Sequence, residues 1–77
     1  MSKKIVIVGA LGYLGTELCK IYSGESWFNK VVAIDSRFVS GRISQLKDWN
    51  IEFQQGHILD KDFLKRNLKD ADIVYHL

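Results

Sequence analysis

The chain has 77 residues, which limits it to one small domain with a thin margin of stability. Its 26% of charged residues and net charge of +2, without a long basic run, give no support for nucleic acid or an anionic membrane as a partner. Its single cysteine excludes an internal disulfide and favours a reducing compartment such as the cytoplasm, and no apolar run approaches the roughly 18 residues of a membrane helix.

The first half of the chain is predicted to form a strand, a helix and a second strand. Residues 5–8 (IVIV) are a β-branched run ended by glycine, which is typical of a strand buried on both faces. Residues 31–34 (VVAI) repeat this pattern. Between them, residues 13–22 have a helical period that predicts one buried stripe. Its members are Leu14, Leu18, Ile21 and Tyr22.

The second half continues the alternation. A short helix is predicted over residues 42–49, and residues 51–55 alternate between apolar and polar, as in a strand. Asp60 is a predicted N-cap for a helix over residues 60–69. Residues 73–77 form the fourth predicted strand.

Alternating strands and helices predict an α/β fold with right-handed parallel crossovers, a doubly wound Rossmann sheet. In the usual order the strands stack 3-2-1-4, with the first two crossovers on one face and the last on the other. Ligands of such sheets bind beyond the carboxyl ends of the strands, at the switch point between strands one and four. The glycine-rich segment GALGYLG lies at this point.

The three glycines of that segment have separate predicted roles. Gly9 allows a tight turn out of the strand, Gly12 lets the backbone approach a diphosphate, and Gly15 lets the helix pack against the sheet. The helix N-terminus adds free N–H groups and partial positive charge. The alternative is a glycine-rich turn without a ligand, but the strand before and the helix after favour a dinucleotide site.

An acid at the end of the second strand supports this interpretation. Asp35 follows Gly15 by about 20 residues, which is where an acid that binds the adenosine ribose is expected. A carboxylate there also repels a 2′-phosphate, so NAD is predicted over NADP. Arg37 could hold a 2′-phosphate instead, but we predict that its side chain is solvated.

The segment GALGYLG resembles the GxxGxxG fingerprint of the extended short-chain dehydrogenase/reductases, the NAD-dependent epimerase/dehydratase family. The spacing GxGxxG would need glycine at Ala10. The segments VVAIDSRFVSGRISQL, QQGHILDKDFL and DADIVYHL are similar to the second, third and fourth strand regions of nucleotide-sugar epimerases. The resemblance therefore covers nearly the whole chain.

The resemblance implies that ten residues bind the cofactor. Those near the pyrophosphate are Gly9, Gly12, Tyr13, Leu14 and Gly15; those near the adenosine ribose are Asp35 and Ser36; those at the adenine edge are His57 and Ile58; and Leu77 approaches from strand four. The chain departs from the family at Val8, where Thr is usual, and at His57, where Asp is usual. His57 is predicted either to stack on adenine or to be a solvated loop residue.

Four other residue types receive structural interpretations. Cys19 is predicted to be a packing residue, and His76 a structural one. Trp27, Phe28 and Trp49 are predicted to cap the sheet ends. No metal site is predicted.

The resemblance also implies a catalytic Tyr-x-x-x-Lys motif, which the 77 residues lack. Residues 1–77 are therefore predicted to be the amino-terminal part of a larger dinucleotide-binding domain, without catalytic or substrate regions and inactive alone. The implied chemistry of the parent is oxidation of a sugar hydroxyl by NAD, rearrangement and re-reduction on a nucleotide sugar. A reductase with another substrate and a free-standing binding module are the alternatives. A bare face and an open edge at strand four predict marginal stability or self-association.

Overall fold

The computed structural model describes residues 3–25 and 29–77. Within them, strands and helices alternate in the predicted order, with every boundary within two residues of its predicted position. The elements are β1 (Lys4–Val8), α1 (Tyr13–Ser23), β2 (Lys30–Asp35), α2 (Ser40–Asp48), β3 (Glu52–Gln55), α3 (Lys61–Leu68) and β4 (Ile73–His76). Trp27 and Phe28 lie outside the described residues.

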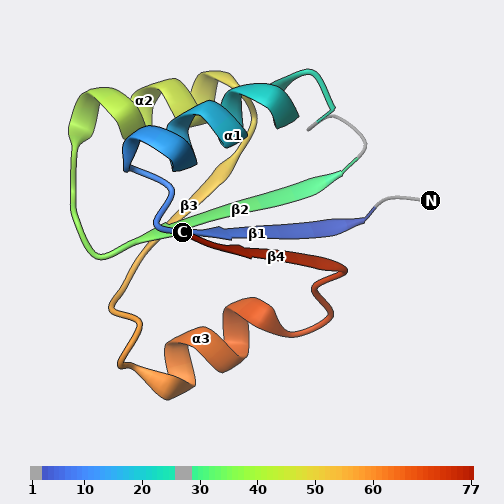
Figure 1. Ribbon diagram of the computed structural model, residues 1–77, viewed down its shortest axis with the longest axis vertical. Coiled ribbons are helices and arrows are strands. Elements are labelled where there is room, and N and C mark those ends of the chain that lie inside the picture. The colour runs from blue at the N-terminus through green and yellow to red at the C-terminus, as the bar shows by residue number, and fades with distance from the viewer. Residues whose placement is uncertain (1–2, 26–28) are drawn as a thin grey trace.

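The four strands form one parallel sheet in the order β3-β2-β1-β4, which confirms the predicted topology. In the inner strand β1, Ile5 pairs with Val31 of β2 on one side and with Ile73 of β4 on the other. Helices α1 and α2 lie on one face of the sheet and α3 on the other (Figure 1). The carboxyl ends of the strands therefore meet at one edge, where the following loops converge.

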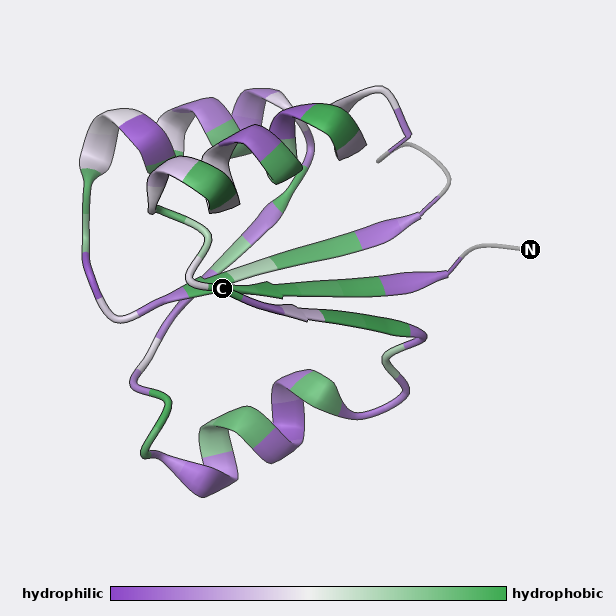
Figure 2. Cartoon of the chain, viewed as in Figure 1, coloured by the Kyte–Doolittle hydropathy of each residue, from purple (hydrophilic) through white to green (hydrophobic). Residues whose placement is uncertain are grey.

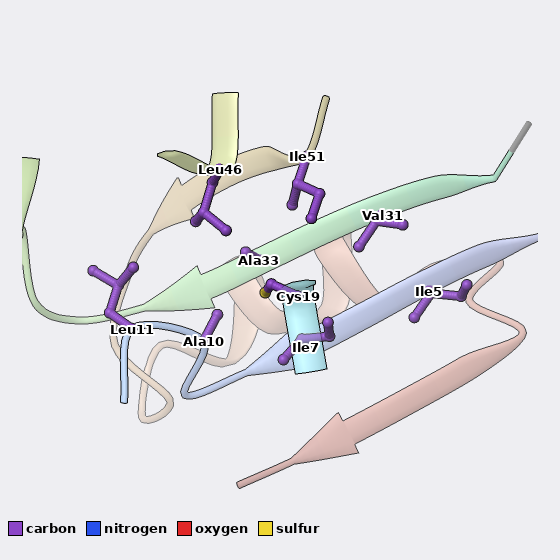
Figure 3. Packing of buried hydrophobic residues seen from close by; sticks show 9 residues of the cluster. All are labelled: Ile5, Ile7, Ala10, Leu11, Cys19, Val31, Ala33, Leu46 and Ile51. Carbon is purple, nitrogen blue, oxygen red and sulfur yellow. The ribbon is translucent and has the colours of Figure 1, made fainter. Parts of the chain in front are cut away.

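The core is divided by the sheet into two clusters. The larger cluster lies under α1 and α2, where Cys19 of α1 packs between side chains of β1 and β2 (Figure 3). Trp49, partly buried, packs against it. The smaller cluster lies under α3 and includes Val6, Val32 and Phe63. Apolar residues fill the middle of β1 and β2, while their amino ends are hydrophilic (Figure 2).

The predicted buried stripe of α1 is partly wrong. Leu14 and Ile21 are 68% and 71% exposed, whereas Gly15 and Cys19 are the buried positions of the helix. Leu18 and Tyr22 pack, partly buried, against the core as predicted. Compared with the predicted orientation, α1 is rotated about its axis, because Gly15 has no side chain and lets the helix approach the turn after β1. Leu14 therefore points outward.

Two side-chain hydrogen bonds stabilise the fold locally, one at the start of α3 and one between α1 and β4. Asp60 caps α3, as predicted, by accepting a hydrogen bond from Phe63 N at 3.0 Å. The Tyr22 hydroxyl of α1 lies 2.9 Å from the Tyr75 hydroxyl of β4, and this hydrogen bond raises the pKa of Tyr22 to about 12. No helix in the described parts of the chain is long and apolar enough to cross a membrane.

Candidate dinucleotide-binding site

Two hollows lie at the carboxyl edge of the sheet. The strand-end hollow, of about 250 Å³, is bounded by the loops after β2, β3 and β4, and the glycine hollow, of about 330 Å³, lies against the start of α1. Gly9, Arg37 and Leu77 line both, so the hollows adjoin. The ten residues implied by the family resemblance all line one hollow or the other.

Gly9 makes the turn that leads from β1 to the site. Its φ of +85° is a left-handed conformation that residues with a side chain rarely adopt. The N–H groups of Gly9 and Ala10 both donate to Ile34 O, at 2.8 and 3.1 Å, which ties the turn to β2. A Cβ on Gly9 would also lie 3.0 Å from Leu77 O, so the chain after β4 passes directly over this glycine.

Gly15 brings α1 against the same turn. A Cβ at this position would lie 2.4 Å from Gly9 O and 2.6 Å from the Cα of Ala10, distances that require the backbone to shift. The predicted packing role of Gly15 is therefore confirmed. The Thr16 hydroxyl donates to Gly12 O at 2.8 Å, a hydrogen bond within the first turn of the helix.

Gly12 is the N-cap of α1 and has no side chain to satisfy the N–H groups of the first turn. These groups have no intrahelical acceptors, and they carry the positive end of the helix dipole. Gly12 itself lines the glycine hollow. This arrangement of free donors beside a side-chain-free backbone is suited to an anion such as a diphosphate.

Asp35 ends β2 and joins the glycine turn to the strand-end hollow. Its side chain is only 4% exposed, and Oδ2 accepts from Leu11 N at 2.9 Å. Arg37 donates from its backbone N and from Nε to Oδ1, both at 3.0 Å, and from Nη2 to Oδ2 at 2.9 Å. The Arg37 side chain lowers the pKa of Asp35 to about 2 despite its burial, with further contributions from the N–H groups of Arg37 and Leu11.

The prediction that Arg37 is merely solvated is therefore wrong. Its side chain is 56% exposed, but its guanidinium forms a bidentate ion pair with Asp35. Ser36 places Arg37 two residues after the carboxylate, a separation that allows the guanidinium to fold back. A second arginine, Arg42 of α2, donates to Leu11 O, so both polar groups of the Leu11 backbone are bound.

The loop after β3 forms the far side of the strand-end hollow. Gly56 fits there because a Cβ would lie 2.4 Å from the ring of Phe63. His57 is exposed, and its Nδ1 accepts from Leu59 N at 3.1 Å. Since this bond occupies the acceptor nitrogen of a neutral imidazole, His57 cannot take over the acceptor role of the aspartate that the family usually has there. Ile58 is half-exposed beside it.

Several residues that line the hollows were not among those predicted from the sequence. They are Arg37, Gly56, His76, Val8 and Ile34. Each of these residues is next in sequence, or nearly so, to a residue that the family resemblance implied. Their place in the hollow follows from the strand order, which brings the strand ends together. His76 ends β4 opposite Val8, at an exposed position beside the site.

Other groups with potential chemistry have structural roles or form no site. Cys19 is fully buried, and burial raises the pKa of its thiol to about 11, which confirms that it is a packing residue. The described residues contain no group of histidine, cysteine and acidic side chains that could hold a metal ion.

The parallel sheet in the order 3-2-1-4, the glycine turn and the acid at the end of β2 define a Rossmann-type fold. The profile of the 3-beta hydroxysteroid dehydrogenase/isomerase family matches residues 6–77, nearly the whole chain. The chain belongs to this family, whose members are short-chain dehydrogenase/reductases of the NAD-dependent epimerase/dehydratase type. The family resemblance of the sequence is thereby confirmed.

Among known sequences, dTDP-D-glucose 4,6-dehydratase of Dictyostelium discoideum is 33% identical over 82 residues. The alignment covers 97% of this chain and 19% of that protein, so the chain spans about a fifth of the length of its curated relative.

Three solved structures share the fold. L-threonine dehydrogenase of Clostridium difficile has a TM-score of 0.78 at 30% identity, over 99% of this chain and 24% of that one. ADP-L-glycero-D-manno-heptose-6-epimerase of Helicobacter pylori has a TM-score of 0.74 at 25% identity, over 97% and 26%. dTDP-glucose 4,6-dehydratase of Bacillus anthracis, solved in complex with NAD, has a TM-score of 0.77 at 18% identity, over 95% and 26%.

Proposed function

We propose that this chain binds the adenosine diphosphate half of NAD across its two hollows. The observation that carries the proposal is the convergence of the glycine turn, the open N-terminus of α1 and the Asp35 carboxylate on one edge of the sheet. The diphosphate would lie against Gly12 and the first turn of α1, and the ribose beside Asp35 and Ser36. Adenine would lie beside His57 and Ile58, in the loop after β3.

The residues present fit this cofactor. Gly12, which has no side chain, lines the glycine hollow, and the helix end supplies N–H donors to an anion. The low pKa of Asp35 keeps its carboxylate ionised, as a ribose acceptor requires. When bound, NAD would supply a hydride acceptor, and this chain's part would be to hold and orient it.

For the whole protein we propose an epimerase/dehydratase-type enzyme that acts on a nucleotide sugar. Support comes from the family match and from the dTDP-D-glucose dehydratase relative at 33% identity. The similarity to an L-threonine dehydrogenase at 30% identity favours a second candidate, a dehydrogenase of a small molecule. In either case the catalytic tyrosine and lysine and the substrate site would lie outside residues 1–77, so these residues alone should not transfer hydride.

We propose the cytoplasm as the compartment, because its reduced cofactor and thiol pools suit a single free cysteine.

The proposal is tested by measuring NAD binding to the full natural protein by calorimetry, with and without Gly12→Val. Gly12 has φ −74° and ψ 173°, an extended conformation that valine adopts without strain, so the fold should survive. The new side chain would enter the glycine hollow and should raise the Kd for NAD at least about tenfold, or 1.4 kcal/mol. Gly24→Ala is the control, because Gly24 has open space around it.

The result that would overturn the proposal is an unchanged Kd in the folded Gly12→Val protein, or no NAD binding by the unmutated protein. Binding by residues 1–77 alone as a soluble monomer would instead favour the alternative of a free-standing dinucleotide-binding module. Both proposals place NAD in the same site. They differ in whether residues 1–77 fold and bind NAD without the rest of the protein.

A further inference from the structure

The loop after β3 fixes the position of the His57 ring. Its Nδ1 accepts from Leu59 N at 3.1 Å, and the His57 carbonyl oxygen accepts from Asp60 N at 3.0 Å. The loop is in turn tied to the end of β2, because Gly56 N donates to Asp35 O at 3.1 Å. His57 is exposed, but it therefore stands at a defined place on the wall of the strand-end hollow.

The hydrogen bond to Leu59 N decides which ring nitrogen of His57 carries hydrogen. A backbone N–H can only donate, so Nδ1 must be the unprotonated acceptor. The ring hydrogen is then on Nε2, since the bond made by one nitrogen of an imidazole sets the state of the other. The polar atom of the ring that remains for a ligand is therefore an N–H donor. An aspartate at this position would offer a carboxylate oxygen instead.

The purine bases differ in what they present to such a donor. Adenine has an acceptor at N7 and, next to it, a 6-amino group that donates. A 6-oxopurine has two neighbouring acceptors on the same edge, N7 and O6. An N–H group facing position 6 therefore meets another donor on adenine and an acceptor on a 6-oxopurine. A hydrogen bond that only one of two bases can make is a source of selectivity between them.

We propose that His57 sets the base preference of the dinucleotide site, so that the chain accepts NAD but binds the corresponding 6-oxopurine dinucleotide more tightly; this inference rests on the proposed function. The 6-oxo ligand carries hypoxanthine in place of adenine, and it makes one more hydrogen bond at His57. Ile58, half-exposed beside His57, offers apolar surface to either base and does not distinguish them.

The experiment compares two replacements of nearly equal shape, His57→Asn and His57→Asp, in the full natural protein. Both new side chains can accept from Leu59 N, because Asn and Asp bind the backbone N–H group two residues on. They differ in the atom that remains: the amide nitrogen of Asn donates, whereas the second oxygen of Asp accepts. Calorimetry gives the Kd for NAD and for nicotinamide hypoxanthine dinucleotide, which has the same phosphates and riboses.

The unmutated protein and His57→Asn should bind the hypoxanthine dinucleotide about threefold more tightly than NAD, the scale of one neutral hydrogen bond. His57→Asp should reverse the order and bind NAD about threefold more tightly. The added negative charge should weaken both ligands alike, so the ratio of the two Kd values is the readout. The fragments 5′-AMP and 5′-IMP should show the same reversal, because they differ in the base alone.

Equal or tighter binding of NAD by the unmutated protein would overturn the inference and leave the proposed function standing. So would a ratio of Kd values that is the same in His57→Asn and His57→Asp when circular dichroism shows that both are folded. The first of these measurements needs no variant, so it decides the question even where a variant does not fold. If the unmutated protein binds neither dinucleotide, the proposed function fails and the inference fails with it.

Discussion

The two faces of the sheet are built from the same strands but are covered unequally. Among the residues that the structure describes, the core under α1 and α2 contains nine buried residues, and the core under α3 contains five. On the first face a glycine, Gly15, meets rigid backbone of the turn after β1; on the second a glycine, Gly56, meets the ring of Phe63. The face with two helices is therefore held by backbone contact as well as by apolar packing.

The difference shows which part of the molecule positions the site. The glycine turn, the start of α1 and the contact of Arg42 with Leu11 O all belong to the well-covered face. The less covered face carries Val74, 46% exposed on β4, the strand at the edge of the sheet. We infer that the diphosphate end of the site is the more rigid part, and that the β4 edge is the weaker part of the fold.

The largest expected effect is that of Gly15→Ala. The new methyl group would lie 2.4 Å from Gly9 O, and neither α1 nor the turn can yield without losing contacts, so we expect a loss of about 3 kcal/mol or more in the free energy of unfolding. Urea unfolding of the 77-residue chain measures it. Gly24→Ala, at φ −74° with open space, should instead stabilise the chain by about 0.5 kcal/mol. Similar values for the two variants would contradict the comparison.

A matched pair on β2 tests the two faces directly. Val31 faces the larger cluster and Val32 the smaller, and they are 2% and 1% exposed. Each change to alanine loses about 1.6 kcal/mol of transfer free energy, to which a cavity term is added. We expect Val31→Ala to cost more, since two helices restrict collapse around it and one helix covers Val32. A larger loss for Val32→Ala in urea unfolding would reverse our ranking of the faces.

The low pKa of Asp35 should make the free energy of unfolding depend on pH. Its pKa is about 2 in the folded chain and about 3.9 when unfolded. Ionised Asp35 therefore stabilises the fold above about pH 4, and this contribution is lost as the pH falls from about 4 to about 2. The difference in unfolding free energy between the natural chain and Asp35→Asn should shrink across that window. In an Arg37→Gln background most of this pH dependence should vanish; if it persists, Arg37 is not its cause.

The smallest expected effect on stability is that of Val74→Ser, within about 0.5 kcal/mol for a half-exposed position. Its effect on association should be larger, because it removes an apolar side chain from an open edge. Sedimentation velocity of the 77-residue chain should show less self-association than the unmutated chain. Ile21→Ser, which removes an exposed side chain from α1 on the other face, should leave association unchanged. A monomeric unmutated chain would refute the predicted self-association.

Prediction from the sequence worked where the signal was local. The continuous apolar runs of β1 and β2 and the N-cap at Asp60 depend on neighbouring residues, and each was placed correctly. The buried side of α1 was partly wrong, because Leu14 and Ile21 fit a helical stripe as well as Gly15 and Cys19 do. The contact of Gly15 with the turn decides between them.

The two arginines show the same limit at the site. Arg37 was predicted to be solvated, but its guanidinium binds the Asp35 carboxylate. The bend of the chain after β2 aims the guanidinium at this carboxylate, and the sequence pattern does not show that bend. Arg42 carried no sequence signal of its contact with Leu11 O, since that contact joins α2 to the turn after β1.

The sequence by itself determined the kinds of element, their order and the turn at Gly9, because apolar period, glycine conformation and capping are properties of short segments. Tertiary structure decided which groups meet. Parallel pairing of β4 with β1 lays Leu77 over Gly9, and pairing of β3 with β2 brings the loop of His57 to the same hollow. The Arg37 guanidinium folds back onto the buried Asp35 carboxylate. These contacts follow from strand order and packing across the sheet, which no short segment contains.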